Sequence, residues 1–115
     1  MTKCITWDAV KFSNFLRKKG LNARVISNNI SRCKRVEKEL SIDLVESTKT
    51  YDDCINVMKA INKYCIDYSQ TPTQRYQLGG TLRLSVRLFV EYQTGIIIPR
   101  NILMPSKKNG ETQNL

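Results

Sequence analysis

The chain has 115 residues, of which 41% are hydrophobic and 25% are charged, a composition that fits one globular domain and excludes a disordered chain. Its formal net charge is +9, and it contains no histidine. The lack of histidine removes the usual general base at neutral pH and the Ser-His and Cys-His nucleophile pairs, so we expect no enzymatic activity.

A first helix is predicted to begin at Trp7, with Thr6 as its N-cap and Asp8 in its first turn. Gly20 is expected to end this helix after the basic cluster Arg17-Lys18-Lys19, which we predict to be solvated or to form ion pairs within the helix. The apolar stripe of the helix is predicted to consist of Trp7, Val10, Phe12, Phe15 and Leu16.

A second helix is predicted from its N-cap Asn22 to about Leu40. Apolar residues recur at every third or fourth position and define its inward face: Ile26, Ile30, Cys33, Val36 and Leu40. Polar and mostly cationic residues follow the same spacing on another face, namely Arg24, Asn28, Ser31, Arg35 and Lys38. The second helix is therefore expected to be apolar inward and cationic outward.

A third helix is predicted from Asp52 to about Tyr68, after a short turn at residues 41–44 and a polar stretch that ends near Thr50. Its inward face is predicted to consist of Cys54, Met58, Ile61, Cys65 and Tyr68. Pro72 prevents the helix from extending further, and residues 69–80 are predicted to form a polar loop. Within this loop, Gly79-Gly80 is expected to form a simple turn rather than an anion-binding helix start.

The segment from Thr81 to Gln93 fits two templates. Every second residue from Leu82 to Tyr92 is apolar, which is typical of a strand, and Thr94-Gly95 would suit a hairpin. A helix instead places an apolar set inward and sets Arg83 and Arg87 one turn apart; the inward set is Leu82, Val86, Phe89 and Tyr92. We predict a helix, because three helices precede it and because of the family resemblance given below. A strand-rich C-terminal half that mediates dimerisation remains the alternative.

The four cysteines are unevenly spaced and include no Cys-x-x-Cys pair. We therefore expect neither a metal site nor a disulfide framework at Cys4, Cys33, Cys54 and Cys65, and predict that the last three are buried core residues. The acidic pair Asp52-Asp53 is explained by the dipole of the helix that it begins. Because no Walker-type phosphate loop is present either, we expect no cofactor and no small-molecule substrate.

Residues 1–6 lack the apolar block of a signal peptide, and the longest apolar run is Ile96-Ile97-Ile98. These features predict a soluble, cytoplasmic protein without a membrane partner. We divide the chain into a helical domain at residues 1–95 and an apolar tether with a loose polar tail at residues 96–115.

The positive charge is unevenly distributed along the chain. Residues 1–40 contain ten Lys/Arg against three Asp/Glu, residues 41–70 three against five, and residues 71–115 six against two. The corresponding net charges are +7, −2 and +4. This division predicts one positive face built from the first and last parts of the chain, as expected of a protein with a nucleic-acid partner.

Three segments resemble the core-binding, or SAM-like, N-terminal domain of tyrosine recombinases and phage integrases. Two of them are FLRKKGLN at residues 15–22 and ISNNISR at residues 26–32, which are similar to the end of the family's first helix and to its basic second helix. The third is TLRLSVRLFVEY at residues 81–92, which is similar to the family's fourth helix. The resemblance covers roughly residues 6–94 and implies an all-α four-helix bundle that forms one arm of a clamp around DNA.

The resemblance also implies which residues contact duplex DNA. They are Arg24, Asn28, Ser31, Arg32 and Arg35 on the second helix, and Arg83 and Arg87 on the fourth. The chain departs from the family pattern at Val25 and Asn29, where the family has Thr and Tyr. No residues after position 95 supply the family's catalytic Arg, Lys, His and Tyr set, so the resemblance implies a non-catalytic DNA-binding module. Since Arg35 and Arg83 are both predicted to face solvent, reversing both charges is expected to weaken DNA binding and to leave the fold intact.

A second hypothesis remains open at this point. The chain could be a small protein-interaction regulator or inhibitor, encoded by a phage or mobile element, whose basic face docks on an acidic partner protein. Composition alone does not separate this hypothesis from DNA binding.

Overall fold

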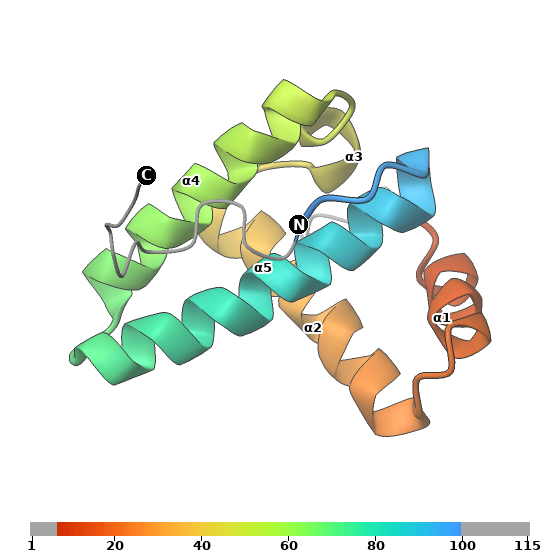
Figure 1. Cartoon of the computed structure of the whole chain (residues 1–115), viewed down its shortest axis with the longest axis horizontal. Helices are drawn as coiled ribbons and strands as arrows, with labels where there is room; N and C mark the ends of the chain where they lie inside the picture. The colour runs from red at the N-terminus through yellow and green to blue at the C-terminus, as the bar shows by residue number, and fades with distance from the viewer. Residues whose placement is uncertain (1–6, 100–115) are drawn as a thin grey trace, which may run out of the picture.

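The computed structural model describes residues 7–99, and all regular secondary structure among them is helical (Figure 1). The five helices are α1 (Ala9–Lys18), α2 (Ala23–Leu40), α3 (Leu44–Ser47), α4 (Tyr51–Tyr68) and α5 (Pro72–Thr94). The all-α prediction is confirmed for this part of the chain. The strand alternative for Thr81–Gln93 is wrong, because the segment lies within α5 and contributes Leu82, Val86 and Phe89 to the core.

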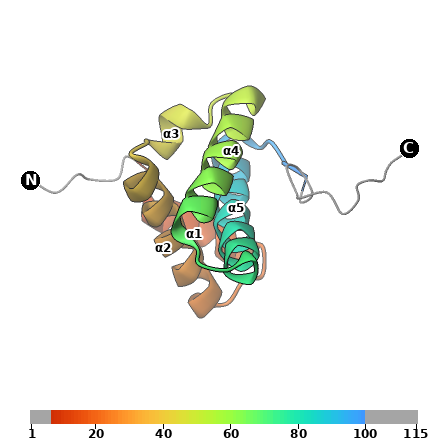
Figure 2. The same ribbon diagram turned by 90° about the vertical axis from the view of Figure 1, so that its left-hand side faces the viewer.

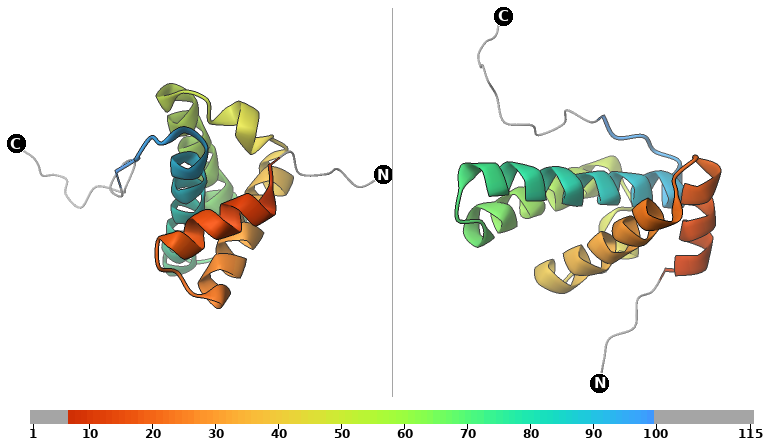
Figure 3. Two further views of the ribbon diagram at one scale, coloured as in Figure 1. Left: turned by 90° about the vertical axis from the view of Figure 1, so that its right-hand side faces the viewer. Right: turned by 90° about the horizontal axis from the view of Figure 1, so that it is seen from below.

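The central element is α5, which packs against α4, α2 and α1. Helices α4 and α5 lie side by side and run in opposite directions, while α2 crosses α5 at an angle (Figure 1). Figure 2 shows α3 at the end of α2, from which the chain continues into α4. Figure 3 shows α1 at the end of α5 that lies opposite the α4–α5 turn. The single hydrophobic core therefore lies around α5, with a different helix on each of its packed sides.

An aromatic cluster fixes α1 against the C-terminal half of α5. The ring of Phe12 lies 5.6 Å from that of Phe89 and 5.3 Å from that of Tyr92, measured between centroids. Trp7 closes the cluster at 5.3 Å from Phe89. The edge-on and tilted arrangements of these rings are the ones that aromatic quadrupoles favour.

The beginning of α1 differs from the prediction. The helix begins at Ala9, because the Asp8 carboxylate accepts hydrogen bonds from the backbone N–H groups of Val10 and Lys11 and so acts as the N-cap. Thr6 lies outside the described residues. Trp7 precedes the helix and is buried, whereas Val10, predicted to be part of the apolar stripe, is 69% exposed. The predicted N-cap of α2 is confirmed, since Asn22 Oδ1 accepts from the Val25 N–H at 2.9 Å.

The predicted loop at residues 69–80 is wrong over most of its length, because α5 begins at Pro72. Proline is tolerated in the first turn of a helix, where its missing N–H would have no intrahelical partner. The Thr71 hydroxyl caps this helix by accepting from the Gln74 N–H. Pro72 therefore ends one helix and begins the next, and Gly79-Gly80 lies inside α5 rather than in a turn.

The buried cysteines and the last described residues complete the core. Cys33, Cys54 and Cys65 are free and buried as predicted, and burial raises the pKa of each thiol. Ile98 is also buried, so the core includes a residue beyond Gly95, the C-cap of α5. Cys4 and the predicted tail after residue 99 lie outside the described residues. Within residues 7–99, no helix is long and apolar enough to cross a bilayer.

The two glycines inside α5 are expected to respond differently to alanine. A Cβ on Gly80 would meet nothing within 4 Å, so Gly80→Ala should raise the free energy of unfolding by roughly 0.5–1 kcal/mol through helix propensity alone. A Cβ on Gly79 would lie 2.7 Å from Arg83 Nη1, so Gly79→Ala must displace that guanidinium. Urea unfolding of both variants should find Gly79→Ala less stable than Gly80→Ala. Equal stabilisation by the two substitutions would contradict the packing of Arg83 over Gly79.

Candidate nucleic-acid interface

The solvent side of α2 carries a strip of polar and cationic side chains that we call the α2 outer face. It consists of Arg24, Asn28, Ser31, Lys34, Arg35 and Lys38, all of which are exposed except the half-buried Arg35. The opposite side of α2 packs on α5, where the Cys33 thiol donates to the Ser85 carbonyl oxygen at 3.4 Å. The predicted division of α2 into an apolar and a cationic side is therefore confirmed.

The cations on the solvent side of α2 are not neutralised by neighbouring acids. Ion pairs among residues 7–99 join Lys19 to Glu91, Lys49 to Glu46 and Lys63 to Asp67, and none of them includes a residue of α2. The Glu37 carboxylate of α2 accepts a hydrogen bond from the backbone N–H of Leu44 at 2.8 Å, and so satisfies a backbone donor at the start of α3. Glu39 lines one hollow together with Ser31, Lys34, Arg35 and Lys38, and it forms no ion pair with another described residue. The face therefore keeps a positive potential.

Arg35 is held by two tyrosines on the last turns of α4. Its Nη2 donates to the Tyr64 hydroxyl at 2.9 Å, and its guanidinium lies 5.7 Å from the centre of the Tyr64 ring and 5.1 Å from that of Tyr68. The two rings stack on each other with centroids 5.4 Å apart. The hydrogen bond to Tyr64 stabilises the charged guanidinium and raises the pKa of Arg35 above its ordinary value. Arg35 is thus only partly turned toward solvent, contrary to its predicted exposure.

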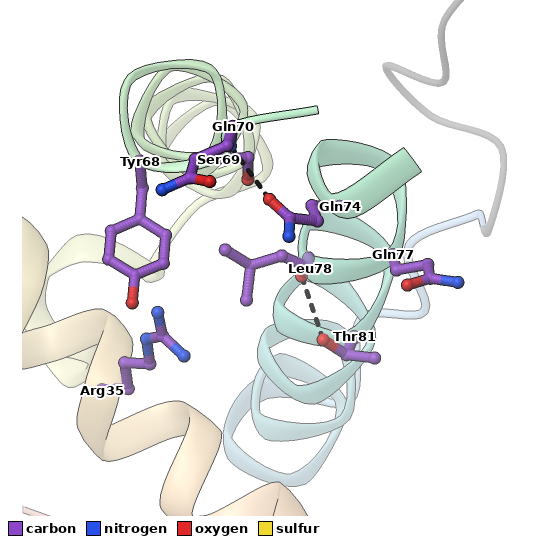
Figure 4. Close-up of a pocket in the computed structure, with 8 residues that line it drawn as sticks. All are labelled: Arg35, Tyr68, Ser69, Gln70, Gln74, Gln77, Leu78 and Thr81. Atoms are coloured by element: carbon purple, nitrogen blue, oxygen red, sulfur yellow. Dashed lines mark hydrogen bonds between the residues drawn. The ribbon is translucent and has the colours of Figure 1, made fainter. Parts of the chain in front are cut away.

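Two hollows flank this arginine and share it. The first, of about 670 Å³, lies between the end of α4, the start of α5 and Arg35 (Figure 4). Its lining consists of Arg35, Tyr68, Ser69, Gln70, Gln74, Gln77, Leu78 and Thr81. The second, of about 400 Å³, is lined by Ser31, Lys34, Arg35, Lys38, Glu39, Tyr64 and Tyr68. The α2 outer face and the α4–α5 turn therefore form one continuous surface, joined at Arg35 and Tyr68.

Sequence reasoning did not find this tyrosine pair. Tyr68 was predicted to face the core because it continues the period of Cys54, Met58, Ile61 and Cys65, yet its side chain is 62% exposed. The end of α4 extends past the core, so the same helical face is covered at Cys65 and open at Tyr68. Tyrosines one turn apart, at positions 64 and 68, were the available signal for a stacked pair.

Arg83 is largely buried, although it contributes to the lining of the hollow that contains Arg87, and its predicted exposure is wrong. Only 7% of its surface is exposed. Its Nη1 donates to Asn62 Oδ1 of α4, and the absence of a side chain on Gly79 gives the guanidinium room to reach that oxygen. Burial away from water lowers the pKa of Arg83. The side chain therefore links α4 to α5 inside the protein.

Arg87 does not join the α2 outer face either. Two residues before it, Ser85 points at α2, where its hydroxyl donates to Asn29 Oδ1 at 2.7 Å. Two residues correspond to about 200° around an α-helix, so Arg87 lies on the side of α5 that is turned away from α2. There it lines a separate hollow with Tyr76 and Leu84. The predicted convergence of cations from two helices on one surface is wrong for Arg83 and Arg87.

The remaining predicted contact residue, Arg32, is half-buried at the edge of the α2 outer face, directly before the inward-facing Cys33. Asn29, where the resembling family has Tyr, is buried; its side-chain amide donates to the Val25 carbonyl oxygen, and its Oδ1 accepts from Ser85. It therefore holds α2 against α5 rather than facing solvent. No group of three or more His, Cys, Asp or Glu side chains that could hold a metal ion occurs within residues 7–99.

Comparison of the chain with protein-family models, with curated proteins and with solved structures found no match.

Reversing the charge of Arg83 is expected to destabilise the fold, contrary to the sequence-based expectation. Arg83→Glu places a carboxylate in a buried position beside the Asn62 oxygen, and should lower the free energy of unfolding by about 3 kcal/mol or more. Arg75→Glu is the matched control, since Arg75 is an exposed arginine of the same helix. Urea unfolding curves measure both. If the two variants were equally stable, Arg83 would have to be solvated.

Proposed function

We propose that the chain is a non-catalytic module that binds duplex DNA through the α2 outer face. The observation that carries the proposal is a set of cations that share one side of an 18-residue helix and form no ion pair with another described residue. Such a surface attracts the phosphate backbone and gains affinity by releasing its counterions.

The composition of the α2 outer face suits a phosphate backbone. Arg24 and Lys38 are exposed cations near its two ends, and a helix of this length extends about 27 Å at 1.5 Å per residue. Asn28 and Ser31 lie between the cations and can donate hydrogen bonds to phosphate oxygens or base edges. The first turn of α2 contains no acidic residue, so the positive end of the helix dipole adds to the attraction.

The resemblance to the SAM-like core-binding domain supports the same helix. In that family the second helix faces DNA, and the corresponding residues here, Arg24, Asn28, Ser31 and Arg35, lie on the α2 outer face, with Arg32 at its edge. The proposal omits Arg83, which is buried, and treats Arg87 as belonging to a different surface. We also propose that the helices form the bundle that is typical of this family.

The proposal is tested by fluorescence anisotropy with a random duplex over a range of salt concentrations. If about five phosphates are contacted, log K should fall with log salt at a slope of about −4 to −5. Replacing Arg24 and Lys38 together by Gln should weaken binding by about tenfold or more at low salt and should make the slope about 2 less steep, because two phosphate contacts are lost.

The matched control replaces Lys11 and Lys59 together by Gln, which changes the net charge equally at exposed cations of α1 and α4 that form no ion pair with a described residue. It should leave affinity within about twofold of the unmodified chain, since neither cation lies on the α2 outer face and salt screens the interaction between separated exposed charges. An equal loss in both double variants would mean that net charge, not the α2 outer face, causes binding. Absence of binding at low salt would exclude the DNA proposal, leaving an acidic protein partner as the remaining hypothesis.

A further inference from the structure

Tyr68 is an exposed aromatic ring that is already fixed in place. It packs against the Tyr64 ring and under the Arg35 guanidinium, yet 62% of its surface faces solvent. Figure 4 shows the ring extending from the end of α4 toward Arg35, with Leu78 of α5 on the other side of the hollow. A flat group that enters the hollow could pack against two apolar surfaces, the exposed part of the Tyr68 ring and the Leu78 side chain.

The rest of the lining offers hydrogen bonds of both kinds. Gln70, Gln74 and Gln77 each carry an amide that both donates and accepts, and the Ser69 hydroxyl is buried without a hydrogen-bond partner among the described residues. Within the described part of the chain, the Gln74 oxygen is the one atom of these amides that is already engaged, by the backbone N–H of Gln70 at 3.0 Å. No carboxylate lines the hollow among residues 7–99. The lining is therefore suited to a planar polar group attached to an anion.

We propose that this hollow holds one unpaired base of a nucleic acid, stacked on Tyr68 and hydrogen-bonded by the glutamines, while Arg35 binds the adjacent phosphate. Aromatic side chains beside cations are the usual means by which proteins hold unpaired bases. The inference depends on the proposed function, because it makes the α2 outer face the duplex side of a junction between double and single strand. Arg35 and Tyr68 line both hollows and so join the two sides.

A base fits these residues better than the base edges of an intact duplex do. Paired bases are stacked on each other and present only their edges in a groove, so the face of Tyr68 would find no partner there. An unpaired base offers its own face to the ring and its Watson–Crick edge to the amides. The preference is therefore for DNA with an unpaired nucleotide next to a duplex.

The test compares three DNA ligands by anisotropy: a blunt duplex, the same duplex with a single-stranded extension of four thymidines, and the same duplex with an extension of four abasic residues. The thymidine extension should bind about tenfold more tightly than the abasic one, a difference of about 1.4 kcal/mol, which is within the range for one base stacked on an aromatic ring. The abasic extension has the same phosphates, so the difference isolates the base.

The protein variants identify the ring. Tyr68→Ala should abolish the preference for the thymidine extension over the abasic extension. Because Tyr68 also holds Arg35, this variant should weaken binding of the blunt duplex and of the abasic extension to the same extent. Tyr68→Phe should keep the preference because it keeps the stacking face. Tyr51→Ala is the control, since Tyr51 is 44% exposed at the opposite end of α4. Circular dichroism melting of each variant checks that the fold is retained.

The outcomes separate this inference from the proposed function. Binding of all three ligands with equal affinity, or a thymidine preference that survives Tyr68→Ala, overturns the base site while the duplex-binding proposal stands. If no duplex binds at low salt, an unattached thymidine oligonucleotide and its abasic counterpart decide the matter. A Tyr68-dependent preference for the thymidine oligonucleotide then supports the base site without duplex binding, and its absence overturns both.

Discussion

The contact between α2 and α5 determines which side chains of α2 face solvent. Where the two helices meet, buried polar atoms of one helix form hydrogen bonds with the other. Ser85 donates to Asn29 and accepts, through its carbonyl oxygen, from the Cys33 thiol. Leaving such buried groups unpaired would cost about 1–3 kcal/mol each, so α2 cannot rotate about its axis without penalty. The cationic side of α2 faces outward because this contact fixes the opposite side inward.

A second contact sets α4 beside α5 and so places the tyrosines. Arg83 crosses over Gly79 to reach Asn62, and the charge-assisted hydrogen bond offsets part of the cost of burying the guanidinium. With α4 fixed in this way, its last turns bring Tyr64 within hydrogen-bonding distance of Arg35 on α2. Of the arginines assigned to DNA from the sequence, one is therefore a structural link, and its burial helps to position another at the surface.

The sequence predicted what depends on local pattern and missed what depends on packing between helices. The predicted apolar periodicity and N-cap of α2 were correct, because both depend only on residues that are close together in the sequence. Arg83 and Arg87 have the same helical spacing as surface arginines, and only the packing of α4 buries the first of them. Other helices cover α5 on several sides, so five of the six alternating apolar residues from Leu82 to Tyr92 are buried or half-buried, whereas Leu84 is exposed. Pro72 was treated only as the end of a helix, although proline equally suits the beginning of one.

Arg35 shows why a half-buried cation can be a better ligand-binding group than a freely exposed one. An arginine that moves freely in solvent must be ordered when it binds a phosphate, at a cost of up to about 2 kcal/mol of side-chain entropy. In the free protein, Tyr64 and Tyr68 already hold the guanidinium through one hydrogen bond and two ring contacts. Much of that ordering therefore precedes binding, which is how preorganisation increases affinity. The partial burial that contradicts the simple prediction for Arg35 thus strengthens the case for its proposed role, whereas the fuller burial of Arg83 removes that residue from the interface.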